Sequence, residues 1–241
     1  MILPGQLRSS ISVSTSSTRK LEAEIDLQYN LGYEGSGVGY DLEVDLTYKP
    51  ISNLNLALEP EFSYRQDELQ YVDQLSVGND DRYIFGSIDQ KTLSMSLRVD
   101  LILTPELTIQ FWGQPFIASG NYYDFKHITD SRADNYHDRF HTYGADEITF
   151  DPDQEMYLVT ESGTGLNYEF ENPDFNVKEF LSNLVFRWEY RPGSFLYLVW
   201  SQSRSGNTSV GNFHLQDDFT GIWDIHPTDV IMLKVSYRIG R

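Results

Sequence analysis

Cysteine is absent from this sequence of 241 residues. Its absence excludes disulfides, thiolate catalysis and zinc sites built from cysteine. The sequence also lacks any apolar run near the roughly 18 residues of a membrane-spanning helix, and its mean hydropathy is -0.42. A transmembrane β-barrel remains compatible with these values, because a barrel strand turns only every second side chain toward lipid.

Basic residues are scarce. The chain has 18 lysines and arginines against 36 aspartates and glutamates, which gives a formal net charge of -18 at pH 7. Nucleic acids and anionic membrane surfaces attract basic proteins, so this balance argues against either of them as the main partner. We therefore expect no nucleic-acid partner.

The most regular pattern lies in residues 20–48, where apolar and polar side chains alternate strictly on both sides of a glycine-rich turn. A period of two is typical of a β-strand with one apolar and one polar face. Each run is close to the roughly 9 to 11 residues with which a tilted strand crosses a bilayer. The first run alternates Leu21, Ala23, Ile25, Leu27, Tyr29 and Leu31 with Glu22, Glu24, Asp26, Gln28 and Asn30.

Alternation of this kind recurs along the chain and predicts about nine strands. Short turns with proline separate some of them, at residues 49–53, 104–106 and 191–194. The opposite strand ends carry polar loops near residues 66–89, 120–178 and 205–228. The strands are expected at about residues 7–16, 20–32, 38–48, 53–65, 90–103, 106–119, 181–190, 194–204 and 230–240.

Short turns at one end and long loops at the other predict an all-β fold, an antiparallel transmembrane β-barrel. Residues 1–241 then form a single barrel domain or a barrel fragment, with a long extracellular loop at about residues 120–178. Because bacterial single-chain barrels have an even number of strands, nine strands favour the C-terminal part of a larger barrel. The missing N-terminal part of the same protein is then a partner, and outer-membrane lipid is another.

Two loops contain further expected elements. Leu215, Phe219, Ile222 and Trp223 are spaced for one face of a helix, and Asp217 with Asp218 suits its start. This spacing predicts a short helix in the last loop and not a tenth strand. Residues 155–160 and 166–170 flank Gly163-Thr164-Gly165 and predict a hairpin in the longest loop.

Aromatic residues gather near the strand ends at the short turns. Trp and Tyr concentrate at both membrane interfaces of a barrel, which predicts an aromatic girdle at this level. The expected girdle residues are Tyr48, Trp188, Tyr190, Phe195 and Tyr237.

Three stretches resemble a known family. They are Asn172-Pro173-Asp174-Phe175-Asn176 with residues 182–194, Gln114-Pro115-Phe116-Ile117-Ala118-Ser119-Gly120 with Tyr123-Asp124-Phe125-Lys126, and Leu233-Lys234-Val235-Ser236-Tyr237. The chain is similar here to the C-terminal β-barrel domain, of unknown function, in bacterial outer-membrane proteins whose N-terminal part is a family 9-like carbohydrate-binding module. The resemblance implies a bacterial outer-membrane location and a link to glycans, and it supplies no catalytic residues.

Eight carboxylates share the polar face of three consecutive strands, and we call them the acidic wall. Hairpin pairing predicts Glu24 opposite Asp45 and Asp26 opposite Glu43, and it places Glu43 near Glu59. Like charges at such pairs repel, so a wet wall would gather cations. A plain hydrated surface, divalent-cation binding and contacts to sugar hydroxyls all remain open. The second hairpin also places Asp41 near Glu61. The wall comprises Glu22, Glu24, Asp26, Asp41, Glu43, Asp45, Glu59 and Glu61.

Basic residues on later strands are expected to face the acidic wall across the lumen. Ion pairs or a transverse field would follow from that arrangement. The residues are Arg98, Arg187, Lys234 and Arg238.

Other candidate chemistry is weaker. His137 and His141 have the i, i+4 spacing of a helical metal pair, but they lack the H-E-x-x-H glutamate. No Ser/His/Asp set stands out, so we expect no enzyme and, apart from a divalent cation, no cofactor. The leading hypothesis is a porin-like outer-membrane barrel that passes or docks a polar solute or glycan. A soluble antiparallel barrel or sandwich and a membrane-embedded hydrolase with a loop-borne site are the alternatives.

Overall fold

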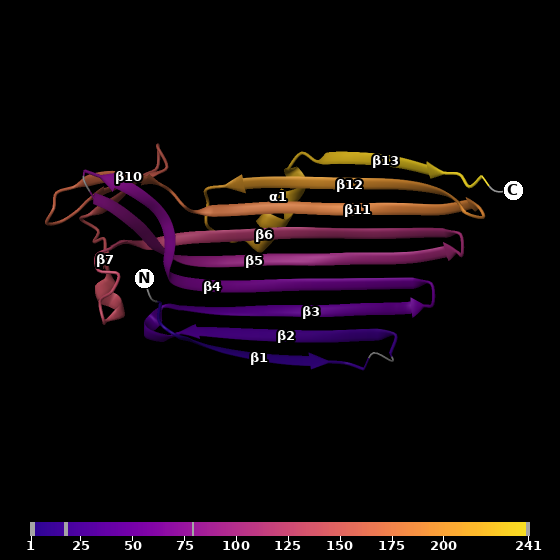
Figure 1. The fold of residues 1–241 in the computed structure, drawn as a ribbon, viewed down its shortest axis with the longest axis horizontal. Coiled ribbons are helices and arrows are strands. Elements are labelled where there is room, and N and C mark those ends of the chain that lie inside the picture. The colour runs from indigo at the N-terminus through magenta and orange to yellow at the C-terminus, as the bar shows by residue number, and fades with distance from the viewer. Residues whose placement is uncertain (1–2, 17–18, 79, 240–241) are drawn as a thin grey trace.

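Nine long antiparallel strands form one open sheet in the computed structural model, which describes residues 3–16, 19–78 and 80–239. The strand order is β1-β2-β3-β4-β5-β6-β11-β12-β13, so nearly every strand pairs with its neighbour in sequence (Figure 1). The strands are β1 Gln6–Ser14, β2 Leu21–Gly32, β3 Gly37–Ile51, β4 Leu54–Val77, β5 Asp80–Thr104, β6 Leu107–Ile128, β11 Phe175–Arg191, β12 Ser194–Thr208 and β13 Thr228–Ser236.

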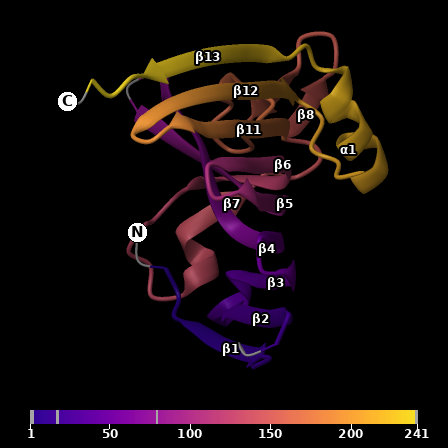
Figure 2. The ribbon, with the colours of Figure 1, turned by 90° about the vertical axis from the view of Figure 1, so that its right-hand side faces the viewer.

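All nine strands expected from the alternation are present, and the fold is antiparallel all-β. The last strand ends at Ser236, and Gly240 of the expected strand lies outside the described residues. In the described part of the chain, β1 and β13 lie at the two ends of the sheet and do not pair with each other (Figure 2). The sheet is therefore open.

The hydrogen-bonded rows of the sheet run obliquely to the line of the short turns. One row joins Leu21, the first residue of β2, to Trp200, the seventh residue of β12. The turns consequently step along the strand direction from β2 to β12, as Figure 1 shows. A stagger of this kind lets strands tilt around a barrel. Between its ends the row passes through Tyr48, Leu56, Val99, Phe111 and Leu184.

The prediction of a polar loop at residues 66–89 is wrong. β4 continues to Val77 and β5 begins at Asp80, so the two strands form one long hairpin. Alternation fails there because β-bulges between Asp67 and Gln70 and between Phe85 and Ser87 change which face each side chain takes. A strand interrupted by bulges does not keep the alternation of apolar and polar residues by which a strand is predicted from sequence.

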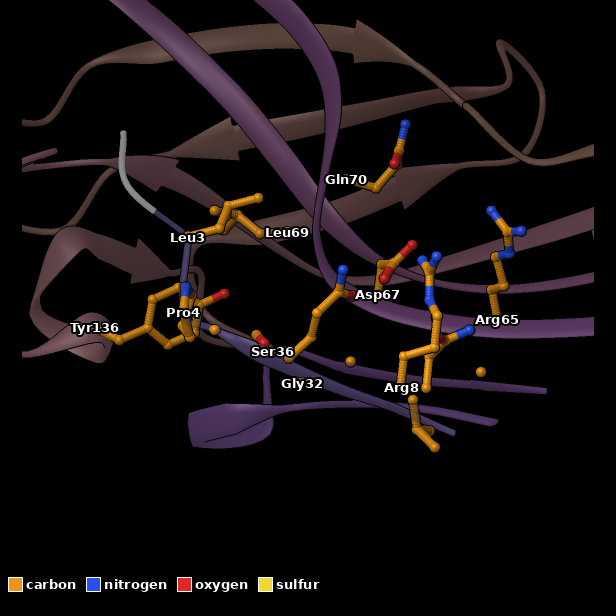
Figure 3. A pocket seen from close by; sticks show the side chains of 16 residues that line it. Leu3, Pro4, Arg8, Gly32, Ser36, Arg65, Asp67, Leu69, Gln70 and Tyr136 are labelled. Carbon is orange, nitrogen blue, oxygen red and sulfur yellow. The ribbon is translucent and has the colours of Figure 1, made fainter. Parts of the chain in front are cut away.

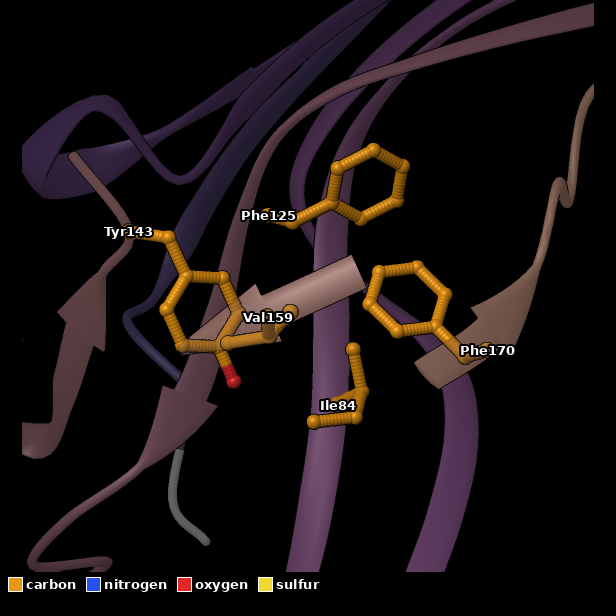
Figure 4. Packing of buried hydrophobic residues seen from close by; sticks show 5 residues of the cluster. All are labelled: Ile84, Phe125, Tyr143, Val159 and Phe170. Atoms are coloured by element: carbon orange, nitrogen blue, oxygen red, sulfur yellow. The ribbon is translucent and has the colours of Figure 1, made fainter. Parts of the chain in front are cut away.

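Residues 120–178 are also more ordered than a loop. β6 extends to Ile128, and a three-stranded sheet with the order β10-β9-β8 packs at the same end of the molecule. The core between this small sheet and the ends of β5 and β6 consists of Ile84, Phe125, Tyr143, Val159 and Phe170 (Figure 4). The remaining elements are η1 Tyr33–Gly35, η2 Tyr136–Arg139, β7 Phe140–Thr142, β8 Ile148–Asp151, β9 Met156–Thr160 and β10 Asn167–Glu171.

Two smaller predictions are confirmed. β9 and β10 form the expected hairpin, and α1 Leu215–Asp224 is the expected helix. Figure 2 shows α1 on one side of the main sheet, and β7 joins that sheet by pairing with the end of β6. No helix in the described part of the chain has the length and apolarity needed to cross a membrane.

The aromatic girdle needs one correction. The register places Trp188 opposite Leu196 on the apolar face, whereas Phe195 pairs with Glu189 on the polar face. There the Phe195 ring lies 4.7 Å from the Arg187 guanidinium. Phe195 therefore does not belong to a lipid-facing girdle, because it occupies an odd position of a strand whose even positions are apolar.

Candidate functional site

The acidic wall is assembled as predicted between β2 and β3. Glu24 pairs with Asp45, and Asp26 pairs with Glu43, so carboxylates face each other across adjacent strands. Directly opposed Cβ atoms lie about 4.5 to 5.5 Å apart in an antiparallel sheet, where like charges destabilise. The wall therefore keeps a local excess of negative charge.

The predicted pairing between β3 and β4 is wrong by two residues. Glu43 pairs with Glu61 and not with Glu59, and Asp41 pairs with Ser63 and not with Glu61. The turn lies at Ser52 and Asn53, beyond the expected centre at Ile51, and a register shift between Tyr48 and Ile51 removes only part of the difference. The correction brings a different glutamate to Glu43 and leaves the acidic character of the face unchanged.

Few cations neutralise this surface. Lys49 Nζ lies 3.7 Å from Glu22 Oε1, and an Arg65 nitrogen lies 3.9 Å from Asp41 Oδ1. Exposed pairs at such distances contribute at most about 1 kcal/mol. A hollow of about 230 Å³ lies over the wall and is lined by Asp26, Gln28, Asp41, Glu43, Glu61 and Arg65.

A larger cavity of about 480 Å³ adjoins the wall toward the loop side (Figure 3). Arg8 and Arg65 bring two guanidinium groups to it, and Asp67 and Gln70 add a carboxyl and an amide. Tyr136 of η2 lines the cavity from the long insertion between β6 and β11. Donors, acceptors and one aromatic ring in a cavity of this size suit a polar solute rather than an apolar one.

Sequence reasoning missed this cavity. Arg8 is an isolated base in a serine-rich strand, and Arg65 stood at the end of an expected strand, so neither carried a spacing signal. Tyr136 reaches the cavity only because η2 folds back over the start of the chain. The carboxylate pairs between β2 and β3 were predictable from the sequence because they depend on one hairpin alone.

The expected basic residues lie on the same face as the acidic wall, but on other strands. Ser96 pairs with Glu59, which places Arg98, two residues further along β5, on the polar face. Arg187 and Lys234 both pair with Tyr197, on the same face. The last of the four, Arg238, follows β13, and its backbone N–H donates to Ser194 Oγ at 3.0 Å.

The two histidines do not share a helical turn. His137 lies in η2, where its Nδ1 is 3.8 Å from Glu68 Oε1. His141 lies in β7, and its Nε2 is 2.7 Å from Glu147 Oε2. Each histidine thus has its own carboxylate, and the described residues contain no group of three or more potential metal ligands.

A buried polar cluster, which the sequence did not predict, connects the three-stranded sheet of β8, β9 and β10 to the end of the main sheet. We call the three-stranded sheet, η2 and the strand ends beside them the loop-side body. We call Arg82, His127, Tyr143, Glu161 and Tyr168 the loop-side cluster. Arg82 Nε donates to Glu161 Oε1 at 2.7 Å, and the Tyr168 hydroxyl donates to the same oxygen at 2.7 Å. The Glu161 side chain is 4 % exposed. Its two partners come from β5 and β10, so Glu161 joins the main sheet to the small sheet.

Hydrogen bonding controls the charge state of this region. Burial raises the pKa of Glu161, but hydrogen bonds from Arg82, Thr164 and Tyr168 outweigh burial and lower this pKa to about 2. The backbone N–H of Gly144 and the His141 ring lower the pKa of Glu147 to about 2 as well, against the effect of burial. Both carboxylates are therefore ionised at neutral pH.

Comparison with known families assigns the chain to one of them. A family model described as a domain of unknown function, DUF5916, matches residues 1–240. The chain belongs to the DUF5916 family. The expected match to a domain of unknown function is thus confirmed, and DUF5916 membership assigns no role to the wall or the cavity. No curated protein and no solved structure matches the chain.

Proposed function

We propose that this DUF5916 chain forms the wall of a bacterial outer-membrane β-barrel, which passes or docks a polar solute along its acidic face. The observation that carries the proposal is a single staggered sheet with one acidic face and one apolar face that is exposed over many strands. A lipid-exposed barrel has this division of faces, with polar residues turned to its interior.

The apolar face supports a lipid contact because it is exposed over many strands. On β13, Ile231, Leu233 and Val235 are 72 %, 63 % and 59 % exposed. Soluble monomers rarely leave contiguous apolar patches of more than a few hundred Å² exposed to water. In a sandwich, a second sheet would cover this face, whereas the α1 helix packs on it here, with Phe219 beside Pro60 and Pro115.

The open edges of the sheet support a barrel completed by further strands. β1 and β13 offer unpaired backbone groups, and in a bilayer such groups cost several kcal/mol each unless they are paired. Pairing of β1 with the N-terminal part of the same protein, and of β13 with its other end, would close the ring. The even strand number of bacterial barrels is consistent with additional strands.

The interior supports a polar, hydroxyl-bearing solute. The acidic wall offers acceptors, and the adjoining cavity adds the two guanidinium groups of Arg8 and Arg65. Acidic and basic groups along one passage create a field that orients dipolar solutes such as sugars. The resemblance to barrels that follow a carbohydrate-binding module makes glycans the preferred class.

The acidic wall is expected to make the pore cation-selective. Replacing Glu24, Asp26, Glu43 and Asp45 with their amides should lower this selectivity, because carboxylate rings attract cations in a confined lumen. The replacement also relieves repulsion, so stability should hold or rise. Reversal potentials of the full-length protein in planar bilayers measure the selectivity, and high salt should weaken it because the Debye length falls from about 10 Å at 0.1 M to about 3 Å at 1 M.

A matched variant separates the wall from net charge. Amide replacement at Asp134, Asp138, Asp153 and Glu169 removes the same number of charges from exposed positions of the loop-side body. We expect this variant to retain the selectivity of the parent. Anion preference in the parent, or equal effects of the two variants, would end the proposal that the wall lines a conducting or docking passage.

A further inference from the structure

Residues 213–225, which contain α1 and which we call the α1 segment, lie on the apolar face of the sheet at the end away from the short turns. The Phe213 ring is 6.2 Å from the Phe62 ring, and the Trp223 ring is 4.9 Å from the Phe180 ring. Phe62 and Phe180 both belong to the apolar face. The segment therefore covers part of the face that the proposed function assigns to lipid.

The α1 segment has a polar edge and an apolar edge, and the two point in opposite directions along the strands. Asp218 accepts a hydrogen bond from Asn176 Nδ2 at 3.1 Å and lies 2.9 Å from Lys178 Nζ. Phe219 and Trp223 instead contact the row of residues two positions nearer the short turns. That row contains Pro60 paired with Met95, and Pro115 paired with Phe180.

The apolar edge continues into the uncovered part of the face. Leu215 and Trp223 remain 54 % and 46 % exposed although they flank the covered row. The neighbouring row, which contains Phe62, extends past the α1 segment to Leu42 and Leu27, which are exposed as well. The exposed edge of the helix and the exposed band of the sheet therefore form one apolar surface.

The level of the α1 segment on the strands matches a membrane interface. Lys178 is the fourteenth residue of β11 counted from Arg191 at the short turn, beyond the roughly 9 to 11 residues that span a bilayer. Arg204 lies at a similar level on β12, where its guanidinium donates to the carbonyl oxygens of Trp223 and Ile225 at 2.8 and 2.6 Å. Charged side chains on the outer face begin here, and the segment contacts Lys178 and Arg204.

We propose that the α1 segment is an interfacial anchor, which lies at the headgroup boundary of the leaflet away from the short turns and inserts Leu215 and Trp223 into it. Helices with an apolar edge and a polar face bind this boundary, and tryptophan prefers it. Asp217 and Asp224 are exposed and would be repelled by an anionic surface, so the contact is apolar and is made with the acyl chains of this leaflet. The inference rests on the proposed membrane location.

Fluorescence quenching by brominated phosphatidylcholine tests the anchor. The chain has four tryptophans: Trp112 on the polar face, Trp188 and Trp200 on the uncovered apolar face, and Trp223. In full-length protein reconstituted into bilayers, a variant that keeps only Trp223 should lose most of its emission to bromines near the headgroup and less to bromines near the chain ends. A variant that keeps only Trp112 should keep its emission with both lipids.

Each outcome separates the anchor from the membrane location. Quenching of Trp200 without quenching of Trp223 would overturn the anchor and leave the proposed function standing. Absence of quenching at Trp188, Trp200 and Trp223 would overturn both. If multiple replacements prevent folding, Trp223→Phe alone should remove the part of the native emission that shallow bromines quench most, and an unchanged profile would also overturn the anchor.

Discussion

Val99→Arg should destabilise the membrane-inserted protein by about 2 to 4 kcal/mol, the cost of an arginine on the lipid face of a barrel near the midplane. Val99 lies on the apolar face, paired with Leu56 and Phe111, and is six residues into the strand when counted from Thr104 at the short turn, about halfway along the roughly 9 to 11 residues that span a bilayer. The guanidinium would have to enter hydrocarbon or pull water and headgroups toward it. Urea titration of the protein folded into phospholipid bilayers measures the change.

Ser94→Arg is the matched control on the same strand. Ser94 lies on the polar face and pairs with Glu61, so the new charge would meet the acidic wall and water. Its cost should be close to zero. Equal losses of stability at the two positions would remove the distinction between a lipid face and a water face.

Glu161→Gln should destabilise the loop-side body by roughly 3 to 5 kcal/mol, the usual cost of removing one partner from a buried ion pair. Arg82 and Glu161 are 16 % and 4 % exposed, so the remaining guanidinium would lie in a site with little water. Because Glu161 joins β5 to β10, the effect should concentrate in the small sheet. Amide hydrogen exchange in β9 and β10 measures this local opening.

Glu169→Gln is the control for the buried pair. Glu169 lies in the same strand as Tyr168 and is exposed, so its replacement should change local stability by less than about 0.5 kcal/mol. Unchanged exchange in the Glu161→Gln protein would show that the loop-side cluster does not hold the two sheets together.

The stability of the loop-side body should also depend on pH, in a direction set by Glu161 and Glu147. Both carboxyls have a folded pKa of about 2, below the value of about 4.3 for a glutamate in an unfolded chain. A lowered folded pKa contributes stability above the unfolded pKa, and this contribution is lost as the pH falls toward about 2. Exchange in β9 and β10 should therefore accelerate as the pH is lowered below about 4, after correction for the intrinsic rate, and Glu161→Gln should reduce that dependence.

The strands of the main sheet were predictable because each has a period of two and most neighbours are joined by a short turn. Glu24 and Asp45 face each other as the sequence predicts, since both lie in one hairpin whose turn is marked by glycines. The next hairpin was displaced by two residues because its turn lies at Ser52 and Asn53 and not at Ile51, and no glycine marks that position. Bulges are also the reason that residues 66–77 of β4 and 80–89 of β5 were not predicted as strands.

The cavity and the loop-side cluster depend on contacts between distant segments. Arg8 and Tyr136 line one cavity although 128 positions separate them in the sequence, and Arg82 meets Glu161 across a separation of 79 positions. No local period encodes such contacts. The α1 helix itself was predictable from its apolar spacing, whereas its position on the apolar face required the partners of Asp218, Phe219 and Trp223.

A spin-label scan of β5 tests most directly that the apolar face contacts lipid. The chain contains no cysteine, so single cysteines at positions 96–101 of the reconstituted protein, beyond the part of β5 that the α1 segment covers, can each carry one nitroxide. We predict that labels at 97, 99 and 101 collide often with oxygen and rarely with a water-soluble nickel complex, and that the intervening positions do the reverse. Odd positions that are shielded from both reagents, as in a soluble core, or open to nickel, as on a wet surface, would contradict the membrane barrel.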